Sequence, residues 1–133
     1  MGEIKVKLGL EKIKNFANQD EDILCVFLFG SYAQRKPNAS SDIDICLVLN
    51  FDNYSSLKLS QKKLEYLKRF TGVDIQIFQQ LPLYIKVRIL KEGRIILCKD
   101  EDKIYNLAFS VITEYSDFEH IFREYLKEIE NVR

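Results

Sequence analysis

Two short motifs carry groups suited to phosphate chemistry. The first is Gly30-Ser31, which directly follows the apolar run from Ile23 to Phe29. Glycine lets a ligand approach the main chain closely, and serine adds a small hydroxyl beside the amides of the turn. If residues 32–36 form a short helix, the Gly-Ser pair lies at its N-terminus, the end of a helix that attracts phosphate. This motif therefore predicts a phosphate-binding turn.

The second motif is Asp42-Ile43-Asp44, which leads into another apolar run. Strand alternation places Asp42 and Asp44 on one face, with backbones roughly 6 to 7 Å apart, and Ile43 on the other. Carboxylate oxygens select hard cations such as Mg²⁺ or Mn²⁺, and Mg²⁺ normally shares its coordination shell with substrate phosphates. Together the two motifs predict a site for a nucleoside triphosphate.

The combination of Gly30-Ser31, ten intervening residues and Asp42-Ile43-Asp44 resembles the signature of the DNA polymerase beta superfamily of nucleotidyltransferases. The short chain resembles the minimal nucleotidyltransferase (MNT) branch, whose members are often paired with HEPN-domain partners in toxin–antitoxin modules. The resemblance covers about residues 20–100. It also includes segments around Asp74 and from Leu81-Pro82 through Glu92-Gly93 to Arg94-Ile95-Ile96-Leu97.

The resemblance implies roles for five residues. Asp42, Asp44 and Asp74 would be catalytic and would hold two Mg²⁺ ions, while Gly30 and Ser31 would bind ATP. AMP would pass from ATP to a hydroxyl, in HEPN-paired members a tyrosine of the toxin. From the residues alone, Asp74 on the polar side of a strand over 73–78 is better explained as an exposed edge residue, and the family resemblance reverses this interpretation.

Two other functions remain open. A non-catalytic antitoxin would neutralise a HEPN ribonuclease by binding alone, although the three carboxylates and the Gly-Ser pair argue against it. A small-molecule nucleotidyltransferase would need an acceptor pocket, and this chain lacks room for the extra helical domain that usually shapes one. The acceptor surface is therefore expected from another molecule or subunit.

The surrounding sequence predicts the elements that position these residues. We expect one domain over 1–133 with an α/β (α+β) nucleotidyltransferase fold, in which a small mixed sheet is flanked by helices and followed by a C-terminal helical extension. Apolar periodicity and capping residues predict the boundaries. Helices are expected over 3–18, 55–70 and 82–92, and strands over 23–29, 41–48, 73–78 and 94–98. On the third helix Lys86, Arg88 and Lys91 could contact phosphates, although a solvated face is the commoner explanation.

The segment after Glu101 has a heptad-like apolar seam with alternating steps of four and three residues. An unbroken helix there would outreach a small sheet. Either it breaks near Ser116-Asp117, where Ser116 and Glu119 would make a capping box, or its far end packs on another chain. We favour the partner surface, for a HEPN-domain protein or a second copy. The seam comprises Ile104, Ala108, Val111, Tyr115, Phe118, Phe122, Tyr125 and Ile129.

Bulk properties narrow the class of protein. The formal net charge is zero, so a long nucleic-acid ligand, which usually requires a basic excess, is disfavoured. No apolar run reaches the ~20 residues of a membrane span, and the start of the chain does not resemble a signal peptide, so we expect a cytoplasmic protein. Cys25, Cys46 and Cys98 are expected to be buried, reduced thiols rather than metal ligands or disulfides.

Overall fold

The computed structural model describes residues 2–30, 43–50 and 53–132, with side chains from Leu8 onward. Within these residues the centre is a sheet with the strand order β3-β2-β1-β4. Its strands are β1 (Ile23–Phe29), β2 (Ile43–Leu49), β3 (Val73–Ile77) and β4 (Arg94–Cys98). β1 runs antiparallel to β2 and β4, whereas β2 and β3 are parallel. The sheet is therefore mixed, as predicted.

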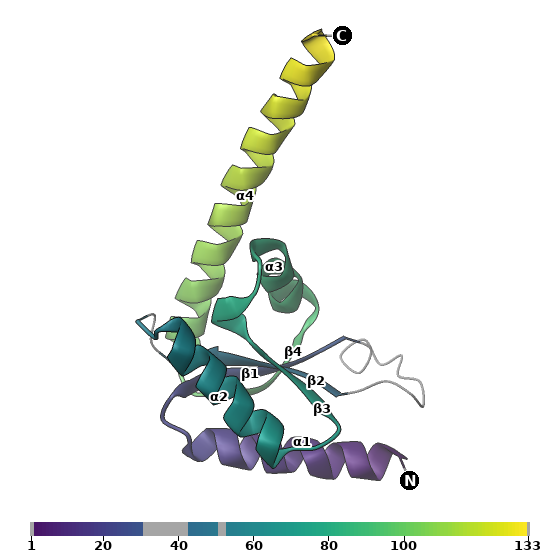
Figure 1. The fold of residues 1–133 in the computed structure, drawn as a ribbon, viewed down its shortest axis with the longest axis vertical. Helices are drawn as coiled ribbons and strands as arrows, with labels where there is room; N and C mark the ends of the chain where they lie inside the picture. Colours follow the sequence, from purple (N-terminus) through teal and green to yellow (C-terminus); the bar gives the residue numbers. More distant parts are fainter. Residues whose placement is uncertain (1, 31–42, 51–52, 133) are drawn as a thin grey trace.

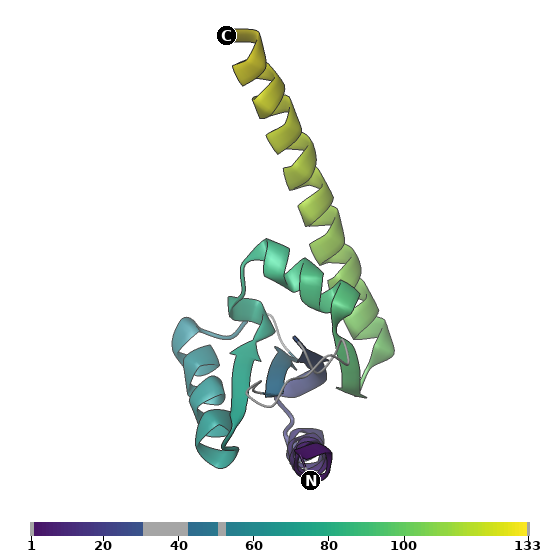
Figure 2. The same ribbon diagram turned by 90° about the vertical axis from the view of Figure 1, so that its right-hand side faces the viewer.

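Helices cover both faces of this sheet (Figures 1 and 2). One core cluster joins α1 (Gly2–Gln19) and α2 (Ser56–Arg69) to one face, through residues such as Ile13, Tyr66 and Ile45. The other joins α3 (Leu83–Glu92) and the first half of α4 (Glu101–Val132) to the opposite face, through Val87, Ile104 and Cys46. Across the described residues, no helix combines the length and apolar composition that a bilayer crossing requires.

Local sequence explains most element boundaries. Ser55 caps α2, because its Oγ accepts a hydrogen bond from the backbone N–H of Lys58 at 3.1 Å. Gly72 follows α2 with a φ of 73°, a backbone angle that favours glycine. β3 ends one residue earlier than the pattern predicts, because Phe78–Gln80 turns into a short 3₁₀ helix. The predicted small mixed sheet flanked by helices and followed by a C-terminal helix is confirmed.

α4 is continuous over 32 residues, about 48 Å at the usual rise per residue. Of the two alternatives that the sequence left open, the break near Ser116-Asp117 is therefore excluded, and the unbroken helix, the favoured alternative, is present. Ile104 and Val111 are buried beside α3, but the helix then leaves the rest of the chain and projects away from the sheet (Figure 1). Beyond Tyr115 the apolar seam continues on an exposed helix.

A buried ion network joins α2 to the turn before β1. Nζ of Lys62 lies 3.0 Å from Asp20 and 2.9 Å from Asp22, and the Lys62 side chain is only 8% exposed. Tyr66 and Tyr54 donate hydrogen bonds to the same two carboxylates, at 2.9 and 2.8 Å. The hydrogen bond from Lys62, followed by the one from Tyr54, lowers the pKa of Asp22. The network holds α2 against the face of the sheet opposite α3.

All three cysteines are free thiols, as predicted. Cys25 and Cys46 are buried, while Cys98, opposite Cys25 in the ladder between β1 and β4, is half-buried. Burial raises the pKa of the Cys25 and Cys46 thiols well above the usual value. These thiols therefore stay protonated at neutral pH and serve as small apolar core residues.

Candidate active site

Asp44 lies near the start of β2, at the point where three strands line up. Its backbone is paired with Phe29 of β1 on one side and with Asp74 of β3 on the other. The neighbouring residues Ile43 and Ile45 enter the core under α1 and α2, so Asp44 faces the layer of α3. Its side chain is half-buried. The predicted alternation is confirmed for Ile43 and Asp44, the two described residues of the Asp-Ile-Asp motif.

Asp74 occupies the matching position on β3. Because register partners in a parallel pair point to the same face, the carboxylates of Asp44 and Asp74 project from backbones about 4.8 Å apart. β3 is an edge strand, but Asp74 is half-buried rather than fully exposed. The structure thus brings together two acidic residues that are thirty positions apart in the sequence.

A hydrogen-bonded chain supports Asp74 from the same strand. Nε2 of Gln76 donates to Oδ2 of Asp74 at 3.4 Å, and Nζ of Lys63 on α2 donates to Oε1 of Gln76 at 3.4 Å. Since the ammonium group fixes which end of the amide carries oxygen, the NH₂ group of Gln76 is directed at the carboxylate. Such supporting contacts orient acidic side chains that bind cations.

Gly30 closes the site at the end of β1. Its φ of 74° lies in the region that favours glycine, and a Cβ placed there would clash with Oδ2 of Asp44. The absence of a side chain therefore lets the turn and the Asp44 carboxylate lie in contact. The positive φ agrees with the backbone freedom predicted for this glycine, whereas the close approach of a ligand stays a prediction.

Ser31 and Asp42, together with the predicted short helix over 32–36, lie outside the described residues. The described part of the chain contains no group of three or more side chains able to bind a metal ion. It does bring Asp44 and Asp74 together, and two adjacent carboxylates repel each other unless a cation lies between them. An all-oxygen donor pair of this kind fits Mg²⁺.

The mixed sheet, its two helical layers and the acidic residues beside Gly30 define a nucleotidyltransferase fold. Residues 11–102 match the family described as "Polymerase beta, Nucleotidyltransferase". The chain belongs to this family, and it is accordingly a nucleotidyltransferase.

Two curated relatives come from Methanocaldococcus jannaschii. "Putative protein adenylyltransferase MJ1547" is 35% identical over 102 residues, which cover 74% of this chain and 75% of the relative. "Putative protein adenylyltransferase MJ1379" is 28% identical over 104 residues, covering 76% of this chain and 94% of the relative. Similarity to each of these proteins extends over about three quarters of this chain.

Solved structures share the fold at lower identity. A chain of a toxin–antitoxin structure with AMP-PNP superimposes with a TM-score of 0.65 at 19% identity, covering 91% of this chain and 97% of that one. A chain from a complex of tri-AMPylated Shewanella oneidensis HEPN toxin with MNT antitoxin gives 0.62 at 17% identity, covering 92% and 97%. These matches confirm the nucleotidyltransferase fold.

Sequence reasoning missed the support for Asp74. Gln76 shares the polar face of β3 with Asp74, so strand alternation alone could have indicated the contact. Lys63 could not have been found in this way, because its contact depends on how α2 lies beside the edge strand. Phe29 was expected only as a buried strand residue, and its alignment with both aspartates follows from the register of the sheet.

Proposed function

We propose that this protein is a Mg²⁺-dependent adenylyltransferase that transfers AMP from ATP to a tyrosine hydroxyl of a HEPN-type toxin and thereby silences it. The main support is the register that aligns Asp44 with Asp74 beside Gly30. The relatives named as protein adenylyltransferases, and the complexes of MNT antitoxin with HEPN toxin, support the acceptor and the partner. A cytoplasmic location is consistent with the use of ATP.

The residues of the chain have separate tasks in this reaction. Asp42, Asp44 and Asp74 would hold two Mg²⁺ ions, and Gly30 with Ser31 would bind the triphosphate. The ions, when bound, lower the pKa of the acceptor hydroxyl and neutralise charge on the phosphates. The acceptor hydroxyl gives up its proton to the solvent as its oxygen forms a bond to the α-phosphorus. The bond from that phosphorus to the bridging oxygen breaks, and pyrophosphate leaves. Gln76 keeps Asp74 oriented throughout.

The test is a labelling assay with purified protein, Mg²⁺, ATP labelled at the α-phosphate and the HEPN-type protein encoded beside it. Asp44→Asn and Asp74→Asn should each lower transfer at least about 100-fold, as expected when a cation ligand is lost. Both variants should keep or gain thermal stability, because fewer like charges remain in the cluster. Asp102→Asn, an exposed residue in the first turn of α4, is the control and should keep full activity.

Two alternatives have distinct outcomes in the same assay. If the wild type silences the partner without binding ATP or transferring AMP, the protein is a non-catalytic antitoxin. If AMP reaches a small molecule in the absence of any protein partner, it is a small-molecule nucleotidyltransferase. Full activity of Asp44→Asn would exclude the site itself.

We also assign the partner surface to the exposed end of α4. Its apolar side chains form what we call the distal stripe, and Phe118 and Phe122 within it stack at 6.1 Å. Acidic residues outnumber basic ones around the stripe, which favours a partner with basic flanks over a second copy of the same acidic helix. The stripe comprises Phe118, Ile121, Phe122, Tyr125, Leu126, Ile129 and Val132.

A further inference from the structure

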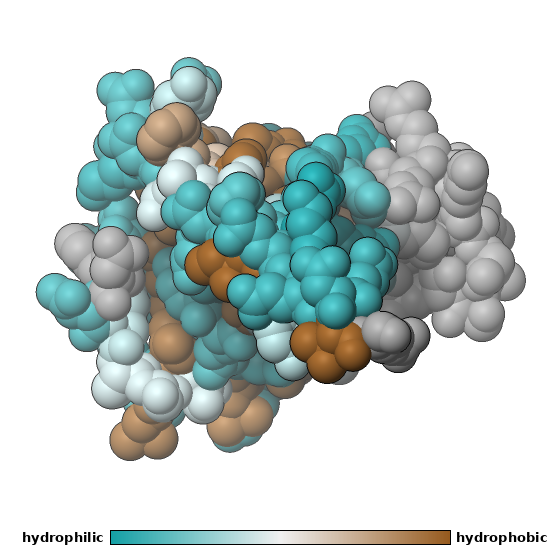
Figure 3. All heavy atoms as spheres, turned by 90° about the horizontal axis from the view of Figure 1, so that it is seen from above, coloured by the Kyte–Doolittle hydropathy of each residue, from teal (hydrophilic) through white to brown (hydrophobic). Residues whose placement is uncertain are grey.

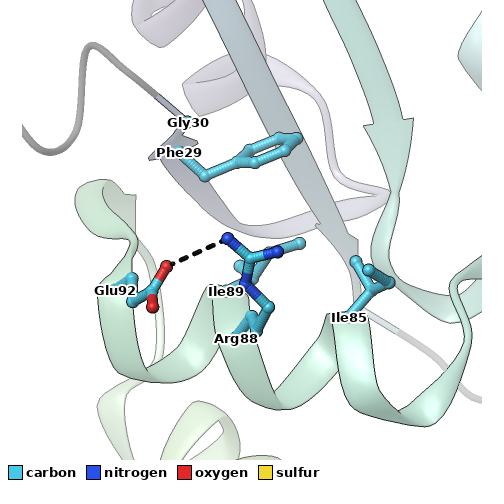
Figure 4. Close-up of a pocket in the computed structure, with 6 residues that line it drawn as sticks. All are labelled: Phe29, Gly30, Ile85, Arg88, Ile89 and Glu92. Atoms are coloured by element: carbon cyan, nitrogen blue, oxygen red, sulfur yellow. Dashed lines mark ion pairs between the residues drawn. The ribbon is translucent and has the colours of Figure 1, made fainter.

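A pocket of about 200 Å³ lies between the end of β1 and α3 (Figure 4). Phe29 and Gly30 form the wall on the side of the sheet, and Ile85 and Ile89 form the apolar wall on α3. Arg88 and Glu92 complete the lining. Since Gly30 touches Asp44, the pocket adjoins the acidic site and is continuous with the turn that we assign to phosphate.

Arg88 is held only weakly in this pocket. Its side chain extends from α3 toward Phe29, and its Nη2 lies 3.5 Å from Oε2 of Glu92 (Figure 4). The two side chains are 64% and 49% exposed. An ion pair this exposed contributes little free energy, so a stronger anion can replace Glu92 at small cost. The guanidinium group is well suited to phosphate, which it binds through two parallel hydrogen bonds.

The reaction requires a cation near Gly30. Two divalent ions offset only part of the negative charge on three carboxylates and a triphosphate. As the bond to the α-phosphorus breaks, charge moves onto the departing pyrophosphate, and a positive group next to it stabilises that change. Among the described residues, Arg88 is the basic side chain that lines a pocket together with Gly30.

We propose that Arg88 is a phosphate-binding residue that contacts the terminal phosphates of the nucleotide and holds pyrophosphate as it leaves. The inference rests on the proposed function, because it assumes that a nucleoside triphosphate occupies the Gly30 turn. The sequence left phosphate contact and a solvated face open for the cations of α3, and the inference assigns phosphate contact to Arg88. Arg88 instead gives the site a preference for polyphosphates over monophosphates.

The experiment measures the binding of ATP, AMP and pyrophosphate by calorimetry in the presence of Mg²⁺. Arg88→Gln should bind ATP and pyrophosphate about 10- to 100-fold more weakly, the usual effect of losing a charge-assisted hydrogen-bonded pair. Its affinity for AMP should stay within about twofold, because a twofold change corresponds to less free energy than one hydrogen bond contributes. Arg88→Lys should recover part of the lost affinity because it retains the charge.

The control is Lys91→Gln, which removes the same charge from the same helix at an exposed residue that does not line the pocket. It should leave all three affinities unchanged. Equal weakening of ATP and AMP in Arg88→Gln would mean that the pocket binds the base or ribose, and unchanged ATP binding would mean that Arg88 has no role; either result overturns the inference. Failure of the wild type to bind ATP would instead overturn the proposed function.

Discussion

Gly30 and Gly72 have nearly the same backbone conformation, with φ of 74° and 73°, but different surroundings. A Cβ at Gly72 would meet nothing within 4 Å, whereas one at Gly30 would clash with the Asp44 carboxylate. The two glycines therefore separate the effect of backbone strain from the effect of displacing a site residue.

At the residue scale we predict that Gly30→Ala abolishes AMP transfer, because the new methyl group pushes Asp44 away from its alignment with Asp74. Gly72→Ala should lose stability by about 1 to 2 kcal/mol from backbone strain alone and keep its activity. Transfer assays and thermal unfolding of both variants make the comparison. Similar activity in the two variants would show that contact with Asp44 does not matter.

The sequence is informative about single residues where chemistry and spacing are local. Gly30 and the alternation around Asp44 follow from neighbouring residues, and the structure agrees with both. The alignment of Asp74 with Asp44 depends on the register between two strands that are far apart in the chain, so only the family resemblance pointed to it. The orientation of Arg88 into a pocket depends on where α3 lies above β1.

At the element scale, Lys62 links α2 to the turn before β1. We predict that Lys62→Met lowers the free energy of unfolding by about 2 to 3 kcal/mol at pH 7, because Asp20 and Asp22 lose their buried partner. Lys58→Met is the matched control, since Lys58 is 3.9 Å from Asp22 and 47% exposed. Its effect should stay within about 0.5 kcal/mol. Urea unfolding measures both.

The ion pair between Lys62 and Asp22 also predicts that the free energy of unfolding depends on pH. The pKa of Asp22 is lower in the folded state than its ordinary value, so its contribution is present above about pH 4 and is lost as the pH falls through the lowered pKa. The difference between wild type and Lys62→Met should therefore shrink at pH 3. A deficit of equal size at pH 7 and pH 3 would contradict the ionic origin of the stabilisation.

Element boundaries are largely readable from the sequence because capping and periodicity act within a few residues. Ser55 begins α2 and Gly93 follows α3 as predicted. The continuity of α4 was not readable, because Ser116 and Glu119 are compatible both with a new helix start and with an exposed helix interior. The stacked pair of Phe118 and Phe122 follows directly after this point and continues the helix.

On the scale of the whole molecule, α4 carries a large apolar surface away from the folded body. Seen from the end where α4 terminates, hydrophobic side chains interrupt the hydrophilic surface (Figure 3). Phe118 and Phe122 are 56% and 50% exposed. The periodicity of the seam predicted this stripe, but sequence periodicity cannot specify what covers it.

We predict that the double substitution Phe118→Glu and Phe122→Glu weakens binding to the HEPN-type partner about 30-fold or more, as loss of paired aromatic anchors does at other interfaces. Thermal stability and ATP binding should not change. Phe109→Glu, at a 67% exposed position outside the distal stripe, is the control. Calorimetry with the purified partner measures the affinities.

The alternative is that a second copy of this chain covers the distal stripe. The molecular mass of the wild type in solution tests this alternative. A dimer that the double substitution converts to a monomer would assign the distal stripe to self-association. Undiminished partner affinity of the double variant would remove the stripe from the interface altogether.

The contact between Gly30 and Asp44 also limits how this protein can change over time. Aspartate is already the shortest acidic side chain, so no acidic replacement at position 44 could make room for a larger residue at position 30. A variant with bulk at position 30 would have to give up either the carboxylate or its place beside the turn. As long as the acid is required, evolutionary drift and protein engineering have no compensating pair of substitutions available at these two positions.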